Sequence, residues 1–364
     1  MKFSVEKNIF EEQLNIVSRA INNKTALPVL SNVLLKVEGN SLYLTTTNLE
    51  IAIETSIAVV NPQDGETTVP VKLLQNYVTL LPNGNLDIDI ENDSLTLSSN
   101  KSKTQIKCIP ATEFPIIPKS PEEVTFSLHQ KEIQKIFTQT VFAAAIDGRR
   151  PILAGVFFQL KTQKLSVVAT DSYRLAEKIV DVDGDQNCSV IIPSHTILEL
   201  IRIISKIEDG DMVFKVSKNQ IIFNVGNIFL TSRLIEGVYP DYKKIIPEQT
   251  ETKASIPVNE FIITLKRANL FAKEASGGVK ILLQNKGVEV ISDTAQTGTE
   301  NGFCECEVVG PEKTISFNAE YIIDALSNMD GDVAELGVND PLTPGVLKNP
   351  KDTTYTHIVM PLKI

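Results

Sequence analysis

Hydrophobic and polar positions along the chain follow a pattern that returns after about 123 residues. The segments ALPVLSNV (26–33), RRPILAGV (149–156) and AKEASGGV (272–279) end on Val33, Val156 and Val279, and each continues into an apolar stretch. A repeat of this length is far longer than the roughly 20–50-residue unit of a solenoid, so each copy has the size of a small domain. The pattern therefore predicts three copies of one domain.

Within each copy, strand-like and helix-like segments come in the same order. SLYLTTTN (41–48), KLSVVATD (164–171) and GVEVISDT (287–294) alternate apolar and polar positions, which is typical of a half-buried strand. A first helix is predicted over 9–21, 133–144 and 261–272. Apolar residues at i, i+3, i+4 and i+7 predict a second helix with one buried face: Leu74, Tyr77, Val78, Leu81; Ile197, Leu200, Ile201, Ile204; and Ile322, Ala325, Leu326, Met329.

This order of strands and helices predicts an α+β domain with both helices on one face of its sheet. The copies are separated by PIIPKSPEEVT (115–125), where three prolines interrupt regular hydrogen bonding, and by PEQTETK (247–253), which is polar. We therefore expect domains over 1–120, 121–247 and 248–364.

Net charge is −10, which argues against a surface that is basic on every side. The distribution is uneven, because six windows that contain the predicted helices together carry +2 and the rest of the chain −12; the windows are 6–24, 70–82, 131–146, 194–206, 260–274 and 317–329. Two interpretations stay open: ordinary solvated helix faces, or a helical layer that faces phosphates. The start of the chain lacks a basic-then-apolar signal, and no stretch is apolar enough to span a membrane, so we expect a cytoplasmic protein.

Sequence motifs for catalysis, metals and cofactors are missing. The chain has no P-loop, dinucleotide-binding, nucleophile-elbow or zinc-protease pattern. The four cysteines show neither disulfide nor zinc spacing, and the three histidines occupy non-equivalent positions of the repeat. The acidic run at 181–185 lacks the glycine and glutamate that a calcium loop needs at its sixth and twelfth positions. We therefore expect no catalytic residues, no metal and no cofactor.

Five motifs, in order along this repeat, resemble the bacterial DNA polymerase III beta subunit family, the sliding clamps. They are LPVL (27–30), RPILAGV (150–156), ATDSYRLA (169–176), SRLIEGVYPDY (232–242) and VMPLKI (359–364). The resemblance covers the whole chain and implies three domains of the processivity-clamp fold. It further implies a head-to-tail homodimeric ring, with helices inside and sheets outside, that encircles double-stranded DNA without reading its sequence and without catalysis.

The resemblance also implies a binding site for short peptides of the DNA polymerase III alpha subunit, the clamp loader and other proteins with a clamp-binding motif. The matching positions are Leu153, Thr170, Ser172, Tyr173, Arg174, Leu175, Pro240, Lys244, Ile245, Tyr321, Thr343, Pro344, Ile358 and Met360. Aliphatic members suit apolar peptide anchors, and a methionine adapts to differing partners. Ser172 and Tyr173 replace the commoner Gly-His of the family, which predicts a shifted peptide preference.

Two further sets of positions follow from the same resemblance. DNA contacts are expected at Lys24, Arg149 and Arg150, and the dimer interface at Lys103, Thr104, Ile106, Leu270 and Phe271. For the two arginines, bracing of a helix end is the alternative to DNA contact. For the whole chain, the alternative function is a non-catalytic three-repeat protein-binding scaffold that does not thread DNA.

Overall fold

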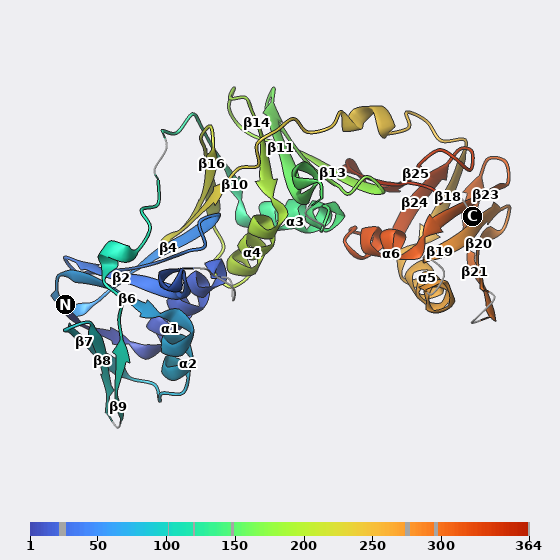
Figure 1. Ribbon diagram of the computed structural model, residues 1–364. Helices are drawn as coiled ribbons and strands as arrows, with labels where there is room; N and C mark the ends of the chain where they lie inside the picture. Colours follow the sequence, from blue (N-terminus) through green and yellow to red (C-terminus); the bar gives the residue numbers. More distant parts are fainter. Residues whose placement is uncertain are drawn as a thin grey trace. The chain divides into compact units, whose positions relative to one another are not determined.

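The computed structural model describes residues 1–21, 27–100, 102–118, 121–146, 149–273, 277–294 and 298–362 (Figure 1). The fold divides into two compact units. One is Met1–Lys131 with Leu198–Leu234, and the other is Glu132–Ile197 with Ile235–Ile364. Each unit contains a large antiparallel sheet that joins strands from two consecutive repeats, and a smaller sheet from one repeat.

Both predicted helices are present in every repeat. They are α1 (Lys7–Val17), α2 (Val71–Thr79), α3 (Gln130–Thr140), α4 (Ser194–Ile204), α5 (Val258–Ala272) and α6 (Ala319–Ser327). The first helices start two or three residues earlier than predicted, because their first residues Lys7, Gln130 and Val258 are already buried in the helix, although two of them are polar. Two of them also end earlier, since their last predicted residues form the 3₁₀ turns η1 (Ser18–Ala20) and η4 (Val141–Ala143).

The first unit contains two sheets. The smaller has the order β5 (Val60–Gln63), β1 (Lys2–Glu6), β7 (Asn85–Glu91), β8 (Ser94–Ser99), β9 (Ser102–Lys107). The larger has the order β10 (Val124–His129), β15 (Asp211–Val216), β16 (Gln220–Val225), β17 (Ile228–Arg233), β4 (Ile51–Ala58), β3 (Ser41–Thr47), β2 (Asn32–Glu38), β6 (Gly65–Pro70). Its continuity depends on the antiparallel pairing of β17 with β4.

The second unit is built in the same way. Its larger sheet has the order β14 (Cys188–Pro193), β11 (Gly155–Lys161), β12 (Lys164–Thr170), β13 (Arg174–Asp181), β26 (Asp352–Val359), β25 (Gly345–Asn349), β24 (Val333–Val338), β18 (Thr252–Pro257), β22 (Glu307–Val309). Its smaller sheet has the order β21 (Gly298–Glu305), β20 (Gly287–Thr294), β19 (Gly278–Gln284), β23 (Lys313–Asn318). Here β26 pairs with β13 across the repeats.

The strands of each repeat are shared between two sheets, whereas the sequence pattern predicted one sheet. The physical reason is that the strand before the first helix pairs with the late strands of its repeat, as β1 does with β7, and not with the hairpin of β2 and β3. The helices contact the hairpin strands: α1 packs on β3 and β4, and α5 on β20 and β21.

Burial confirms the alternation that predicted the strands. Leu42 and Leu44 in β3, and the equivalent apolar pairs in β12 and β20, have no exposed surface. The predicted stripes of the second helices are also buried except for Tyr77 and Ile201, which are half-buried, and Leu74, Ile197 and Ile322 are fully covered. The repeat therefore correctly predicted which faces form the core.

Candidate functional site

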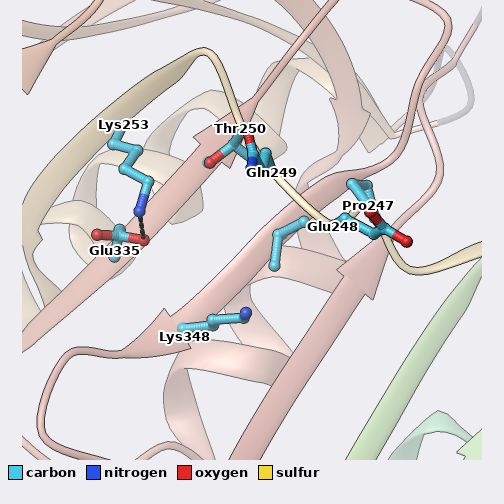
Figure 2. A pocket seen from close by; sticks show the side chains of 9 residues that line it. Pro247, Glu248, Gln249, Thr250, Lys253, Glu335 and Lys348 are labelled. Carbon is cyan, nitrogen blue, oxygen red and sulfur yellow. Dashed lines mark ion pairs between the residues drawn. The ribbon is translucent and has the colours of Figure 1, made fainter. Parts of the chain in front are cut away.

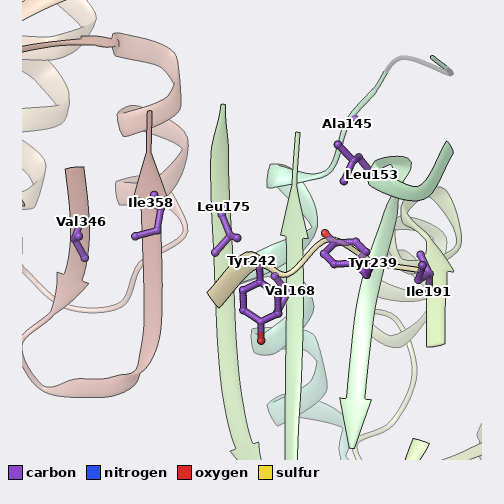
Figure 3. Packing of buried hydrophobic residues seen from close by; sticks show 9 residues of the cluster. All are labelled: Ala145, Leu153, Val168, Leu175, Ile191, Tyr239, Tyr242, Val346 and Ile358. Atoms are coloured by element: carbon purple, nitrogen blue, oxygen red, sulfur yellow. The ribbon is translucent and has the colours of Figure 1, made fainter. Parts of the chain in front are cut away.

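An apolar cluster lies on the large sheet of the second unit, at the junction between the second and third repeats (Figure 3). Its buried members are Ala145, Leu153, Val168, Leu175, Ile191, Tyr239, Tyr242, Val346 and Ile358. In the sheet, Leu175 lies opposite Ile358, which in turn lies opposite Val346. Cross-strand neighbours share a face of the sheet, so these three side chains form a continuous apolar row across β13, β26 and β25.

The segment that connects the second and third repeats, residues 235–250, crosses this face, and we call it the strap. Tyr239 stacks on Phe157 of β11, with ring centroids 4.8 Å apart and planes 7° apart. Tyr242 donates its hydroxyl hydrogen to Glu177 Oε1 at 2.7 Å. Burial raises the pKa of Tyr242, and the nearby carboxyl of Glu177 raises it further. Two aromatic anchors therefore fix the strap over the apolar row.

A tight turn between β12 and β13 borders the cluster. Asp171 Oδ1 accepts hydrogen bonds from the backbone N–H groups of Tyr173 and Arg174, both at 2.9 Å. Thr170 Oγ1 donates to the carbonyl of Arg174 at 2.6 Å and accepts from the N–H of Ser172 at 3.1 Å. Ser172 has φ +79°, a left-handed conformation that favours glycine. These bonds hold Tyr173 outward, with 58% of its surface exposed.

Arg174 lies on the face of the sheet opposite Leu175, because adjacent residues of a strand point to opposite faces. Its guanidinium binds Asp171 (Nε–Oδ2 3.1 Å) and Asp324 of α6 (Nη1–Oδ2 2.5 Å). It also lies 4.6 Å from the ring centroid of Tyr321. Arg174 and Tyr321 therefore brace the turn against α6, with Nε and Nη1 of the guanidinium donating to carboxylates of the protein.

The positions predicted for peptide binding all fall in the second unit. Leu153, Thr170, Arg174, Leu175 and Ile358 are buried. Exposed members form a rim around the cluster: Ser172, Tyr173, Pro240, Lys244 and Ile245. Lys244 pairs with Asp241 of the strap at 3.0 Å. Met360 is half-buried, and its N–H donates to the carbonyl of Tyr173 at 2.8 Å. Thr343 and Pro344 are half-buried in the turn before β25. Distant segments thus meet around the cluster, whereas Arg174 and the neighbouring Tyr321 lie on the opposite face of the sheet.

Several contributors were missed from the sequence. Val168 and Glu177 lie two residues from the predicted Thr170 and Leu175, so strand alternation alone places them on the same face. Tyr239 and Tyr242 occur within the quoted motif SRLIEGVYPDY, but no local pattern marks them as anchors. Val346 joins the cluster only because β25 pairs with β26, a contact that the sequence does not reveal.

The other predicted positions are separate from this cluster or only adjoin it. Arg150 Nη1 donates to Ser172 Oγ at 2.6 Å, which places its guanidinium beside the turn. Lys24 lies outside the described residues. Lys103, Thr104 and Ile106 lie on the edge strand β9, and Ile106 is buried. Leu270, which is 76% exposed, and Phe271 lie in the last turn of α5.

A polar pocket of about 290 Å³ adjoins the apolar row (Figure 2). Pro247, Glu248, Gln249 and Thr250 of the strap lie over it, and Val346 forms part of both the pocket and the cluster. Lys253 and Glu335 form an ion pair there at 3.0 Å. The pocket's paired charges suit polar groups, so apolar anchors of a ligand belong to the cluster.

Neither metal nor membrane sites are found in the part of the chain that the structure describes. Among these residues there is no group of three or more His, Cys, Asp or Glu side chains that fits a metal ion. In the same ranges, no helix has the length and apolarity needed to cross a membrane.

The fold and the cluster define a class: a repeat protein in which three copies of one α+β domain share sheets and present an apolar site on a sheet face. Family models of the DNA polymerase III beta subunit match residues 1–118 (N-terminal domain), 127–241 (central domain) and 243–363 (C-terminal domain).

Known relatives match over their whole length. The beta sliding clamps of Staphylococcus aureus strain N315 and Staphylococcus epidermidis are both 31% identical, over 100% of this chain and 99% of theirs. The DNA polymerase III beta subunit of Pseudomonas aeruginosa superposes with a TM-score of 0.96 at 27% identity, covering 100% of both chains. The beta chain from Streptococcus pneumoniae gives 0.95 at 29%, again over 100% of both.

The chain therefore belongs to the DNA polymerase III beta subunit family, the sliding clamps. Clamps of this family are non-catalytic processivity factors: they form homodimers, encircle DNA, and bind DNA polymerase III and other proteins. The predicted fold class, the predicted function and the absence of a catalytic role are confirmed at the level of the family.

Proposed function

We propose that the apolar cluster and its rim are the site through which this clamp captures linear segments of the polymerase, the clamp loader and other partners. The observation that carries the proposal is the apolar row of Leu175, Ile358 and Val346, bordered by the exposed Tyr173 and Ile245. The row itself is buried and forms a floor, so aliphatic side chains of a peptide gain free energy by displacing water from the exposed apolar rim at Tyr173 and Ile245. The half-buried Met360 at the edge supplies a thioether that adapts to differing side chains.

The test is fluorescence polarisation with a labelled peptide that carries leucine and phenylalanine anchors. Met360→Ala is expected to weaken binding roughly 10- to 100-fold, the loss of about 1.4–2.8 kcal/mol that an anchor contact contributes. The matched control is Val309→Ala on β22, at the far edge of the same sheet, where 61% of the valine is exposed. Equal affinities of Met360→Ala and the control would overturn the proposal.

We propose further that the dimer forms by pairing β9 of one protomer with β21 of the other. In the repeat, β9, β17 and β26 are equivalent strands, and so are β4, β13 and β21. Within the chain β17 pairs with β4, and β26 with β13, while β9 and β21 are edge strands. A head-to-tail pair of chains satisfies both remaining edges twice, which closes a ring.

The repeat also supplies the register of this pairing. Leu230 lies opposite Ile53 at the first junction, and His357 lies opposite Ala176 at the second. The equivalent pair at the dimer contact is Thr104 opposite Glu300 of the partner subunit. In this register Lys103 on β9 lies next to the position opposite Glu300 of the partner subunit, and opposite charges favour this orientation.

Cysteine cross-linking tests the register. The double variant Thr104→Cys/Glu300→Cys is expected to form covalent dimers on mild oxidation, because directly opposed strand residues lie within disulfide reach. The control Thr104→Cys/Asn301→Cys shifts one residue to the opposite face and is expected to remain uncross-linked. A 40.1 kDa monomer by light scattering at micromolar concentration would contradict the dimer itself.

The helical side of the same contact is expected to be apolar. At the first junction Arg19, just beyond α1, pairs with Glu199 of α4 at 3.3 Å. Leu270 occupies the position equivalent to Arg19, and Leu80, 83% exposed, follows α2 at the position of α4 residue Ile203. Burial of Leu270 against Leu80 of the partner subunit replaces the ion pair with a hydrophobic contact.

For DNA we propose loose phosphate contacts by Lys24, Arg149 and Arg150, without base reading. The bond from Arg150 to Ser172 competes with that role for Arg150. Replacement of all three by alanine is expected to reduce retention on nicked circular DNA and to leave the dimer intact. Unchanged retention would remove these residues from the DNA-binding surface.

Clamp action as a whole is tested by cutting the DNA. Protein loaded on a nicked circle is expected to remain until a restriction enzyme linearises the circle, and then to slide off.

We also propose domain boundaries near residues 120 and 247. A cytoplasmic location is proposed as well, because the DNA that a clamp encircles, the bacterial chromosome, lies in the cytoplasm.

A further inference from the structure

The turn before β4, in the first unit, repeats the turn before β13 hydrogen bond for hydrogen bond. In both turns, the side chains of a threonine and of the Asn or Asp that follows it bind the same four backbone groups. In the first unit Thr47 Oγ1 donates to the carbonyl of Ile51 (2.9 Å) and accepts from the N–H of Leu49 (3.0 Å). Asn48 Oδ1 accepts from the N–H groups of Glu50 and Ile51 (2.9 Å each).

In each turn, one backbone carbonyl accepts a hydrogen bond from a segment of the following repeat. The N–H of Arg233, at the end of β17, donates to the carbonyl of Glu50 at 2.9 Å, as Met360 does to Tyr173 at 2.8 Å. The left-handed residue is also duplicated, since Leu49 has φ +75° where Ser172 has +79°. A backbone frame like that of the proposed peptide site therefore exists at the junction of the first and second repeats.

A second element of the site is duplicated beside this turn. The 3₁₀ turns η2 (Pro28–Ser31) and η5 (Pro151–Ala154) occupy equivalent positions. The N–H of Leu30 donates to the carbonyl of Leu27 at 3.1 Å, as Leu153 does to Arg150 at 3.0 Å. Leu27 is thus the equivalent of Arg150.

The connecting segments correspond too. Ile109 donates its N–H to Thr68 at 3.1 Å, as Ile235 does to Ile191 at 2.8 Å. With one extra residue in the first segment, the dipeptide Phe114-Pro115 matches Tyr239-Pro240 of the strap, and Phe114 is buried as Tyr239 is. All parts of the second frame lie within the first compact unit.

The two sites differ in where their apolar surface lies. At the proposed peptide site the rim pair is polar, Arg150 bonded to Ser172. At the second frame the same positions hold Leu27 and Leu49, which are 51% and 46% exposed. The floor shows the reverse change, because Ala52 and Thr231 stand where Leu175 and Ile358 stand. The floor of the second surface is therefore less apolar, and its exposed apolar contacts are at the rim.

Charge at the second frame also differs. The exposed Arg233 stands where Met360 stands at the proposed peptide site. A ligand that places an aliphatic side chain on Leu27 and Leu49 therefore gains from an acidic residue beside it.

We infer that this surface is a second docking site, for an extended partner segment with an aliphatic residue flanked by an acidic one. The inference rests on the proposed function, because it assigns the second site the same ligand class as the first. The ring then offers two unequal sites per chain. The second one is expected to bind at least 10-fold more weakly, because its floor lacks the aliphatic row.

Calorimetric titration of the full-length protein tests this, with one synthetic peptide that contains leucine, phenylalanine and aspartate. The wild-type chain is expected to bind two equivalents, one tightly and one weakly. Met360→Glu should remove only the tight phase. Leu49→Gly should lower the affinity of the weak phase at least fivefold. Because glycine relaxes the left-handed φ, this loss does not come from misfolding.

Val60→Glu is the matched control, because this exposed valine follows β4 at the end remote from Leu49. A tight phase unaffected by Met360→Glu would overturn the proposed function itself. A single equivalent in the wild type, or a weak phase that Leu49→Gly leaves unchanged, would overturn the second site while the first stands.

Discussion

His357 predicts an acid sensitivity of the junction that carries the proposed peptide site. This histidine lies on β26, has no exposed surface, and stacks on Phe142 with ring centroids 5.5 Å apart. Among the described residues, neither ring nitrogen has a hydrogen-bond partner. Burial, and to a smaller degree the Arg174 guanidinium, lower the pKa of His357 to about 3.

A histidine whose pKa is lower in the folded protein than in the unfolded chain reduces the free energy of unfolding as the pH falls. Between the unfolded pKa near 6.5 and the folded value of about 3, the unfolded chain binds more protons, so acid favours unfolding. For these two pKa values the linkage relation gives a loss of about 2 kcal/mol between pH 7 and pH 5. Above pH 7 the group contributes almost no pH dependence.

Urea unfolding of wild type and His357→Leu at pH 7 and pH 5 measures this effect. Leucine keeps most of the volume and cannot be protonated, so the variant should lose about 2 kcal/mol less than wild type between the two pH values. The exposed Val309→Ala leaves His357 in place, so it serves as the control and should follow the wild-type pH dependence. If His357→Leu and wild type lose the same free energy of unfolding, the assignment of a neutral, desolvated His357 is wrong.

Three further predictions concern the turn and the strap. Ser172→Gly relaxes the φ of +79° and should raise the free energy of unfolding by up to about 1 kcal/mol, whereas the control Ser127→Gly within β10 should lower it. If thermal melting shows that both variants are less stable than wild type, residue 172 is not strained. Asp171→Ala removes the acceptor of two backbone N–H groups and of Arg174 Nε, so it should lower the free energy of unfolding by about 2 kcal/mol and weaken peptide binding. The control Asn48→Ala should leave the tight phase of the peptide titration intact. Tyr242→Phe deletes the donor to the buried Glu177 and should destabilise the protein by about 1–3 kcal/mol in urea unfolding; no change would mean that water satisfies Glu177.

Local patterns determined most of the repeat. Because side chains alternate in strands and recur every 3.6 residues in helices, the buried positions of β3, β12 and β20 and of the three second helices were predictable from one copy to the next. The helix starts were less predictable, because Lys7 and Gln130 begin helices without belonging to an apolar stripe. The resemblance to clamps then supplied candidate site positions that no local pattern marks.

The sequence alone could not decide how the strands of neighbouring repeats join. The pairing of β17 with β4 and of β26 with β13 depends on hydrogen bonds between segments more than 170 residues apart, and such contacts have no local sequence signal. The same pairing puts Val346 in the apolar row and leaves β9 and β21 as edges. It also makes the turns at Leu49 and Ser172 comparable atom by atom, because each is completed by a strand from the next repeat. The amino-acid pattern thus determined each domain, and tertiary strand pairing decided where the domains meet and where their binding surfaces lie.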